Sequence, residues 1–266
     1  MYFPNVLKDP LLTAIDAAMA VVPRPRPPKE AFEKCRVVAH RGAHDVDVEN
    51  TLPAFLRAVE LGAWGIEFDI RWTKCGRPIV HHDAHFQRLF GDSVRLKDLD
   101  FNELRRRIPA VPTLDEVVAA VGGRAHLMIE VKGRASKIGA REWASLKEAL
   151  GGSEPVRDHH LMSLDPDVLR NCPIAPNEAL LPIAEFNIGV MTRLSVRKGL
   201  GGVTGQYLMI SDRLIRRLHD RTQRVGTGFV CSRSVLYREL NRGADWLFSD
   251  TAADLLKIIQ DEKNTP

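Results

Sequence analysis

Short apolar runs alternate with amphipathic, helix-like stretches from residue 36 to the end of the chain. The apolar runs predict strands at residues 36–39, 64–70, 78–82, 126–131, 159–163, 179–183, 201–203, 225–230 and 245–248. The clearest amphipathic stretches predict helices at residues 50–62, 101–107, 114–121, 166–169, 211–221, 235–242 and 253–260. Strands that alternate with helices over short connections favour a parallel sheet covered by helices.

The length favours one large domain over two small ones. An α/β barrel of eight strand–helix units takes about 250 residues, and this chain has 266. We therefore predict the α/β class and a single-domain (β/α)8 TIM barrel over residues 31–266. Residues 1–30 are predicted to form an extra N-terminal helix near 11–22, followed by a stiff linker that contains Pro23, Pro25, Pro27 and Pro28.

The composition narrows the class further. Hydrophobic residues make up 44% of the chain and charged residues 27%, as is usual for a globular protein. No apolar run reaches the roughly 18 residues that cross a bilayer. The stretch 11–22 carries Asp16 and predicts a peripheral helix, with weak contact to a membrane surface as the alternative. The four cysteines form no close pair, so we expect reduced thiols and a cytoplasmic protein.

Basic residues are concentrated in one part of the chain. The net charge is +4, and residues 193–242 hold many arginines against few carboxylates. A basic face of this kind attracts anionic lipid, phosphate esters or nucleic acid. Solvated helix surfaces are the more ordinary interpretation, because no nucleic-acid motif accompanies the charge. We therefore predict a small anionic substrate or a lysolipid, and no nucleic-acid partner.

Ionisable residues follow several of the predicted strands, where a barrel interior would otherwise be apolar. Burying such groups costs free energy unless they have a function or a partner. The carboxyl ends of barrel strands share one face of the fold, where active sites lie. The residues concerned are His40, Arg41, Glu67, Asp69, His82, Glu130 and Lys132.

The period-2 alternation of a strand brings the carboxylates together. Glu67 and Asp69 are two residues apart and point to one face, while Phe68 points to the other. By the same argument Glu130 and Lys132 share a face. Three carboxylates this close would repel one another unless a cation lay among them, and oxygen ligands favour Mg²⁺ or Ca²⁺. A surface ion-pair network is the alternative.

The order of these motifs resembles that of the glycerophosphodiester phosphodiesterase family. The resemblance is strong from Val37 to Lys132 and continues weakly through 163–166 and 243–250. It rests on the segments His40-Arg41-Gly42, Glu49-Asn50-Thr51, Glu67-Phe68-Asp69, His82-Asp83 and Glu130-Val131-Lys132.

The family likeness implies a role for each matching position. Glu67, Asp69 and Glu130 would bind one divalent cation, Mg²⁺ or Ca²⁺. His40 and His82 would be the general acid–base pair, one activating the attacking oxygen and the other protonating the leaving alcohol.

The likeness also implies groups that serve the phosphate. Arg41 and Lys132 would hold it, and Glu49 and Asn50 would support the loop of the first histidine or touch substrate. Nearby, Asp83 either orients a histidine or caps a loop. Arg88 either reaches the substrate or pairs with Asp92, and His81 is expected to pack away from His82.

Two departures from the family pattern bear on the substrate. The family usually has a tryptophan near the end of the seventh barrel strand, where this chain offers only Phe229, or Trp246 further on. The stretch between Asp83 and Glu130 is short, which predicts room for the barrel helix alone and a more open mouth than in relatives with a helical insertion. Such a mouth would favour a bulky leaving group such as that of a lysolipid.

The main functional hypothesis is metal-dependent hydrolysis of a glycerophosphodiester to glycerol phosphate and an alcohol. A lysophospholipase D or a sphingomyelinase D-like activity would use the same residues. A phosphatidylinositol-type phospholipase C shares a barrel and paired histidines, but the carboxylate pairs argue against it. A non-catalytic protein that binds phosphodiesters is the alternative from another class.

Overall fold

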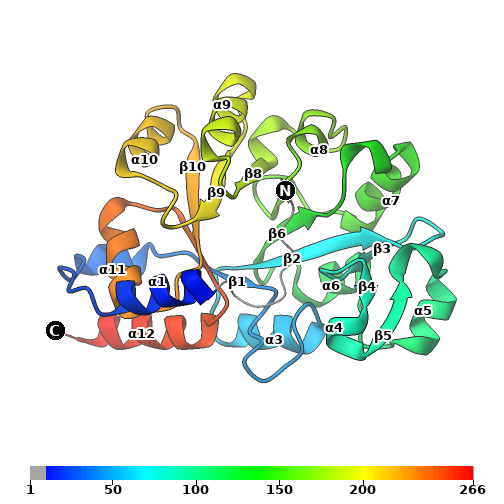
Figure 1. Cartoon of the computed structure of the whole chain (residues 1–266), viewed down its shortest axis with the longest axis horizontal. Coiled ribbons are helices and arrows are strands. Elements are labelled where there is room, and N and C mark those ends of the chain that lie inside the picture. The colour runs from blue at the N-terminus through cyan, green and yellow to red at the C-terminus, as the bar shows by residue number, and fades with distance from the viewer. Residues whose placement is uncertain (1–9, 266) are drawn as a thin grey trace.

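The computed structural model describes residues 10–265, so residues 1–9 of the predicted N-terminal segment lie outside it. Eight parallel strands close into a barrel with helices outside it (Figure 1), as predicted. Around the barrel the strands are β1 Val37–His40, β2 Gly65–Trp72, β6 His126–Val131, β7 His159–Ser163, β8 Leu180–Ala184, β9 Gly202–Gln206, β10 Arg224–Gly228 and β11 Trp246–Ser249.

One predicted barrel strand lies outside the barrel. The strand β3 (Pro78–Val80) pairs antiparallel with the end of β2, with Ile70 opposite Val80. The turn between them is too short for the crossover that a parallel pair requires. The prediction of 78–82 as a barrel strand was therefore wrong, and β6 is the third strand of the barrel.

The segment after β3 is also more elaborate than predicted. It contains β4 (His85–Phe86), α4 (Gln87–Phe90), β5 (Asp92–Arg95), the 3₁₀ turn η1 (Leu96–Asp98) and α5 (Phe101–Arg107). These elements have a small core of their own, which includes Phe86, Leu96, Leu99 and Leu104. Of these elements only α5 was predicted, and with the bounds observed. The expectation of room for a barrel helix alone was wrong, because β4, α4, β5 and η1 are too short to leave a periodic pattern in the sequence.

Helices follow the barrel strands and cover the outside of the sheet. Thr113 caps α6 in a reciprocal capping box with Glu116. For α7 and α9 the sequence pattern had indicated no helix. The helices are α3 Leu52–Glu60, α6 Leu114–Val121, α7 Ala140–Leu150, α8 Pro166–Arg170, α9 Ile188–Lys198, α10 Asp212–His219, α11 Arg233–Arg242 and α12 Ala252–Asn264, with 3₁₀ turns η2 Ala135–Lys137 and η3 Asn177–Ala179.

The N-terminal segment packs against the last two helices of the chain, α11 and α12. The helix α1 (Pro10–Ala20) contacts α11, and the Tyr207 hydroxyl donates a hydrogen bond to Asp16 Oδ1 at 2.7 Å (Figure 1). After the proline-rich linker, the short helix α2 (Lys29–Glu33) packs against α12. Within residues 10–265, no helix is long and apolar enough to cross a membrane.

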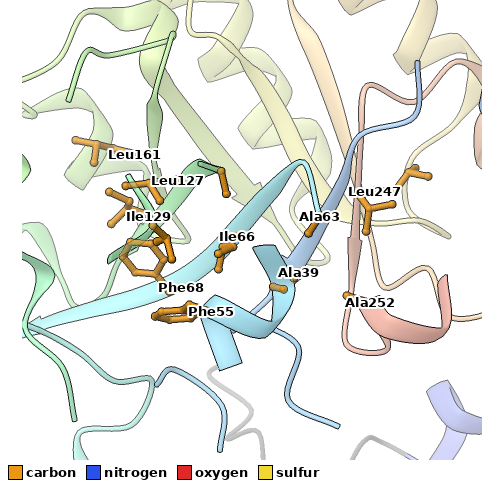
Figure 2. Close-up of a cluster of buried hydrophobic side chains, with 14 of the residues drawn as sticks. Ala39, Phe55, Ala63, Ile66, Phe68, Leu127, Ile129, Leu161, Leu247 and Ala252 are labelled. Atoms are coloured by element: carbon orange, nitrogen blue, oxygen red, sulfur yellow. The ribbon is translucent and has the colours of Figure 1, made fainter. Parts of the chain in front are cut away.

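The main core lies between the outer face of the sheet and the helices. Ile66 and Phe68 on β2 point toward α3, where the ring of Phe68 lies 5.4 Å from that of Phe55, centroid to centroid (Figure 2). Because side chains alternate along a strand, this packing directs Glu67 and Asp69 toward the barrel interior.

Candidate active site

Three buried carboxylates meet where β2 and β6 end. Asp69 and Glu130 are register partners on the two strands, and Glu67 lies two residues before Asp69. Each residue offers an oxygen, and these atoms lie within 4.8 Å of one another. Their oxygen ligands suit Mg²⁺ or Ca²⁺. The structure thus brings together all three predicted metal ligands.

Two cations already contact this group. The Lys132 Nζ atom lies 2.9 Å from Asp69 Oδ1 and 2.8 Å from Glu130 Oε2. The Arg41 Nε atom lies 3.3 Å from Asp69 Oδ2, and Arg41 also donates a hydrogen bond to Glu49 at 2.9 Å. Burial lowers the pKa of Lys132, but attraction to Asp69 and Glu130 outweighs this and raises it, so the ammonium stays charged.

Glu67 is the member of the trio with no cationic partner among the described lysines and arginines within ion-pair distance. Its Oε2 atom is buried and accepts no hydrogen bond within residues 10–265. Burial, and then repulsion from Asp69, raise the pKa of Glu67 to about 8. An orphaned carboxylate oxygen beside two further carboxylates is the arrangement that a bound divalent cation relieves. The residues present therefore fit such a cation.

An aspartate from the last strand holds the first histidine. Ala39 pairs with Ser249 in the sheet, so His40 and Asp250 follow side by side. His40 Nδ1 lies 2.5 Å from Asp250 Oδ1, and His40 Nε2 lies 3.6 Å from Glu67 Oε2. Burial lowers the pKa of His40, but attraction to Glu67 and then Asp250 outweighs it and raises the pKa.

A neighbouring aspartate holds the second histidine. His82 Nδ1 lies 2.7 Å from Asp83 Oδ1, and Arg71 donates a hydrogen bond to the His82 carbonyl at 2.8 Å. Burial lowers the pKa of His82, and the hydrogen bond to Asp83 offsets only part of that effect. Burial raises the pKa of Asp69, but attraction to Lys132 outweighs this and lowers it, and the imidazoles of His82 and His40 add to the lowering. His40 thus contacts the trio through Glu67, and His82 directly follows His81, whose backbone amide donates a hydrogen bond to the Asp69 carbonyl at 2.9 Å.

The supporting residues form a second set of contacts around this centre. Asn50, at φ 58°, donates a hydrogen bond from Nδ2 to Asp69 Oδ2 at 2.9 Å. Glu49 accepts hydrogen bonds from Arg41 and from Arg88, whose Nη2 lies 2.7 Å from Glu49 Oε1. Arg88 also donates to Asp83 at 2.7 Å, so it pairs with these two carboxylates and not with Asp92.

Two aromatic residues were candidates to replace the family tryptophan, and the structure separates them. The ring of Phe229, directly after β10, lies 5.1 Å from the ring of His40. Trp246 begins β11 at the opposite end of the barrel, against His160 and Trp64. Phe229 is therefore the aromatic neighbour of the site. His81 packs on Phe86, and its Nε2 atom lies 3.2 Å from the His85 carbonyl, which fits the expected packing role.

The family model for glycerophosphoryl diester phosphodiesterases matches residues 40–253, from the first histidine of this site to just past its last aspartate, Asp250. The chain belongs to that family. Among curated proteins, glycerophosphodiester phosphodiesterase 1 of Homo sapiens is 34% identical over 119 residues, which is 40% of this chain and 36% of the relative. A glycerophosphodiester phosphodiesterase of Caldanaerobacter subterraneus is 37% identical over 111 residues, 37% of this chain and 46% of the relative. The matched part is thus less than half the length of either relative.

Solved phosphodiesterase structures share the fold. A glycerophosphodiester phosphodiesterase from Thermotoga maritima superposes with a TM-score of 0.72 at 23% identity, covering 84% of this chain and 98% of the other. An Oleispira antarctica phosphodiesterase, solved with the product sn-glycerol-3-phosphate, superposes with a TM-score of 0.72 at 18% identity, covering 87% and 99%.

Sequence reasoning gave no role to Asp250 and left that of Asp83 open. Asp250 had appeared only in a weak motif at the end of the chain, more than two hundred residues from its partner. The signal was its position directly after the last strand, which closes the barrel beside the first. Because β1 and β11 pair where the barrel closes, the residues directly after these two strands lie side by side.

Proposed function

We propose that this protein hydrolyses glycerophosphodiesters to glycerol phosphate and an alcohol, with a divalent cation at Glu67, Asp69 and Glu130. The observation that carries the proposal is one rim on which three carboxylates adjoin two imidazoles, each fixed by its own aspartate. The names of the relatives support the substrate class, and the glycerol phosphate in the Oleispira structure supports the product.

Charge neutralisation is the first requirement of such a reaction. A phosphodiester is a stable anion, and cations around its non-bridging oxygens stabilise the additional charge of the transition state. Lys132 and Arg41 are buried cations beside the carboxylate trio, in position to hold those oxygens. When bound, the divalent cation supplies further Lewis-acid stabilisation of the same oxygens.

Each displacement at phosphorus needs two proton transfers. One imidazole accepts the proton of the attacking oxygen as its bond to phosphorus forms. If this oxygen belongs to water, glycerol phosphate forms directly; if it is the neighbouring glycerol hydroxyl, a cyclic phosphate forms first and water opens it in a second displacement of the same kind. The other imidazole donates a proton to the alcohol oxygen as its bond to phosphorus breaks. Asp250 and Asp83 fix the Nδ1 side of His40 and His82, which leaves both Nε2 atoms for these transfers.

A lysophospholipase D activity remains the second candidate, because it breaks the same kind of bond with the same residues. Its support is apolar surface beside the site: Phe229 is 39% exposed and contacts His40, and Val48, on the loop after β1, is 44% exposed. A long acyl chain would find more contact there than a choline headgroup would.

The assay measures choline released from glycerophosphocholine and from lysophosphatidylcholine, with and without a chelator. We expect chelator-sensitive release by the wild type and loss of at least about 100-fold in His40→Ala and His82→Ala. His219→Ala is the matched control, since His219 pairs with Asp245 outside this site. Equal rates in wild type and His40→Ala would refute the assignment of this site, and binding without turnover would indicate a phosphodiester-binding protein.

A further inference from the structure

The outer surface of α9 carries two apolar residues followed by two cations. Phe186, in the loop before the helix, is 79% exposed, and Val190 in the first turn is 45% exposed. Arg193 and Arg197 follow and are also exposed. Within α9, spacings of three and four residues place Val190, Arg193 and Arg197 along one stripe of the helix surface, and Phe186 lies in the loop four residues before Val190.

The fold does not require this stripe to be apolar. Met191 and Ser195 on the opposite face of α9 are buried, and Leu194, beside the stripe, is buried as well, so these residues supply the packing of the helix. Arg193 folds back toward the first turn, where its guanidinium lies within contact distance of the position that a side chain at Gly189 would occupy. The cationic group therefore lies close to the exposed apolar residues.

The basic segment noted in the sequence divides into two groups in the structure. Arg233, Arg238 and Arg242 form ion pairs with carboxylates. Of the remainder, Arg224 lies on β10. The others form no ion pair within residues 10–265 and lie on α9, on α10 or in the turn directly after α10, and the two helices are beside each other in Figure 1. These others are Arg193, Arg197, Lys198, Arg213, Arg216, Arg217 and Arg221, and the nearby carboxylates are Glu185, Asp220 and Asp212, which pairs with Arg242.

The exposed apolar residues also gather at the face of the barrel that holds the candidate site. Most of the described large hydrophobic residues with high exposure follow the carboxyl end of a barrel strand. Val46 and Val48 follow β1, Phe186 and Val190 follow β8, and Phe229 follows β10. Apolar groups around a rim that adjoins a cationic face form the pattern of proteins that lie on a lipid surface.

We propose that the outer face of α9, with the arginines of α10, docks on an anionic membrane surface. Phe186 and Val190 enter the headgroup region, while Arg193 and Arg197 contact lipid phosphates. The loop after β8 then brings the mouth of the barrel to the lipid surface, from which a lysolipid substrate would enter. This last step rests on the proposed function, whereas the docking does not.

Nucleic acid fits the same surface less well. A polyanion would meet the cations of both helices, but it offers no apolar phase for Val190, Val46 and Val48. An anionic lipid surface offers an apolar phase to Phe186 and Val190 and phosphate groups to the two arginines that follow them.

The test is cosedimentation of the full chain with vesicles of phosphatidylcholine alone or mixed with phosphatidylserine. We expect binding to the mixed vesicles that weakens with salt. The double variant Arg193→Glu/Arg197→Glu should weaken it by at least about tenfold, and Phe186→Ser by about fivefold. The control Arg106→Glu/Arg124→Glu makes the same change of charge on exposed residues of other parts of the barrel and should bind as the wild type does.

Hydrolysis of soluble glycerophosphocholine separates this proposal from the previous one. Arg193→Glu/Arg197→Glu and Phe186→Ser should retain that activity, because none of these residues belongs to the candidate site. Loss of vesicle binding with intact hydrolysis supports the docking face. Absence of vesicle binding by the wild type, equal loss in the control variant, or binding of labelled single-stranded DNA in place of vesicles would overturn it. A wild type that binds vesicles but hydrolyses nothing would refute the enzymatic proposal alone.

Discussion

The Nδ1 atom of His40 lies 2.5 Å from Oδ1 of Asp250, although 210 residues separate the two in the chain. The contact exists because the first and last strands of the barrel pair with each other. His44 Nε2 lies 3.8 Å from the same oxygen, so one carboxylate faces two imidazoles. Burial raises the pKa of Asp250, but attraction to His40 outweighs this and lowers the pKa, which keeps the carboxylate ionised.

Replacing Asp250 tests whether it positions His40. We expect Asp250→Asn to lower kcat about 100-fold with little change in KM, since an imidazole with the wrong tautomer transfers protons poorly. A purely structural role would lower the melting temperature instead, and the pH profile of kcat would keep its shape. Asp254→Asn, an exposed carboxylate on α12, is the control and should leave both quantities unchanged.

Metal binding at the carboxylate trio is testable without turnover. Mg²⁺ or Ca²⁺ should raise the melting temperature of the wild type, because a ligand that binds only the folded state stabilises it. Glu67→Gln and Glu130→Gln should remove most of that increase, as each deletes a charged ligand. Glu49→Gln keeps the trio and should retain the increase. If neither ion changes the melting temperature of the wild type, the proposal of a metal site at these three carboxylates is contradicted.

The strands and the carboxylate trio were accessible from the sequence because both follow short-range rules. Apolar runs marked the barrel strands, and alternation placed Glu67 beside Asp69. The partner of His40 was missed, since Asp250 meets it only through closure of the barrel, and the one signal was its position directly after the last strand. The antiparallel strand β3 was mistaken for a barrel strand because three apolar residues look the same in either setting. The small core around Phe86 was missed for a similar reason.

The ring of Phe229 should contribute to activity through its contact with His40. Phe229→Ala removes an edge-on aromatic contact, and we expect kcat/KM for the soluble diester to fall about 2- to 10-fold. Phe229→Trp should retain activity, because a larger ring fills the same place beside the imidazole. Steady-state kinetics of the two variants decide the point. The argument fails if alanine and tryptophan have the same effect.

Three histidines near the opposite end of the barrel are buried and face no carboxylate closely. His126 Nδ1 lies 3.2 Å from the Arg157 carbonyl and therefore carries the proton that it donates. His126 Nε2, 2.7 Å from His160 Nδ1, must then accept from His160. His159 Nδ1 pairs with the Ser153 hydroxyl at 2.8 Å. Every ring is neutral in this arrangement.

Burial lowers the pKa of His126 and of His159 to about 4, and burial with repulsion from His126 lowers that of His160 to about 3. The ordinary pKa is 6.5, so between these values the unfolded chain binds protons that the folded chain does not. The free energy of unfolding must therefore fall as the pH drops from 6.5 toward 4. Repulsion from Arg224 adds to the effect on His126 and His160, and attraction to Asp158 opposes it at His126.

A variant that lacks one of these histidines should show a weaker dependence of the unfolding free energy on pH. Between about pH 7 and about pH 5 the unfolding free energy of the wild type should decrease by roughly 2 kcal/mol more than that of His160→Leu. This is the contribution of one histidine whose pKa is lowered in the folded state. Urea unfolding at the two pH values measures the difference. His85→Gln, an exposed histidine near the candidate site, controls for the loss of a histidine as such and should follow the wild type. If the unfolding free energy of His160→Leu falls by as much as that of the wild type, His160 does not contribute to the acid sensitivity, which then arises from other groups.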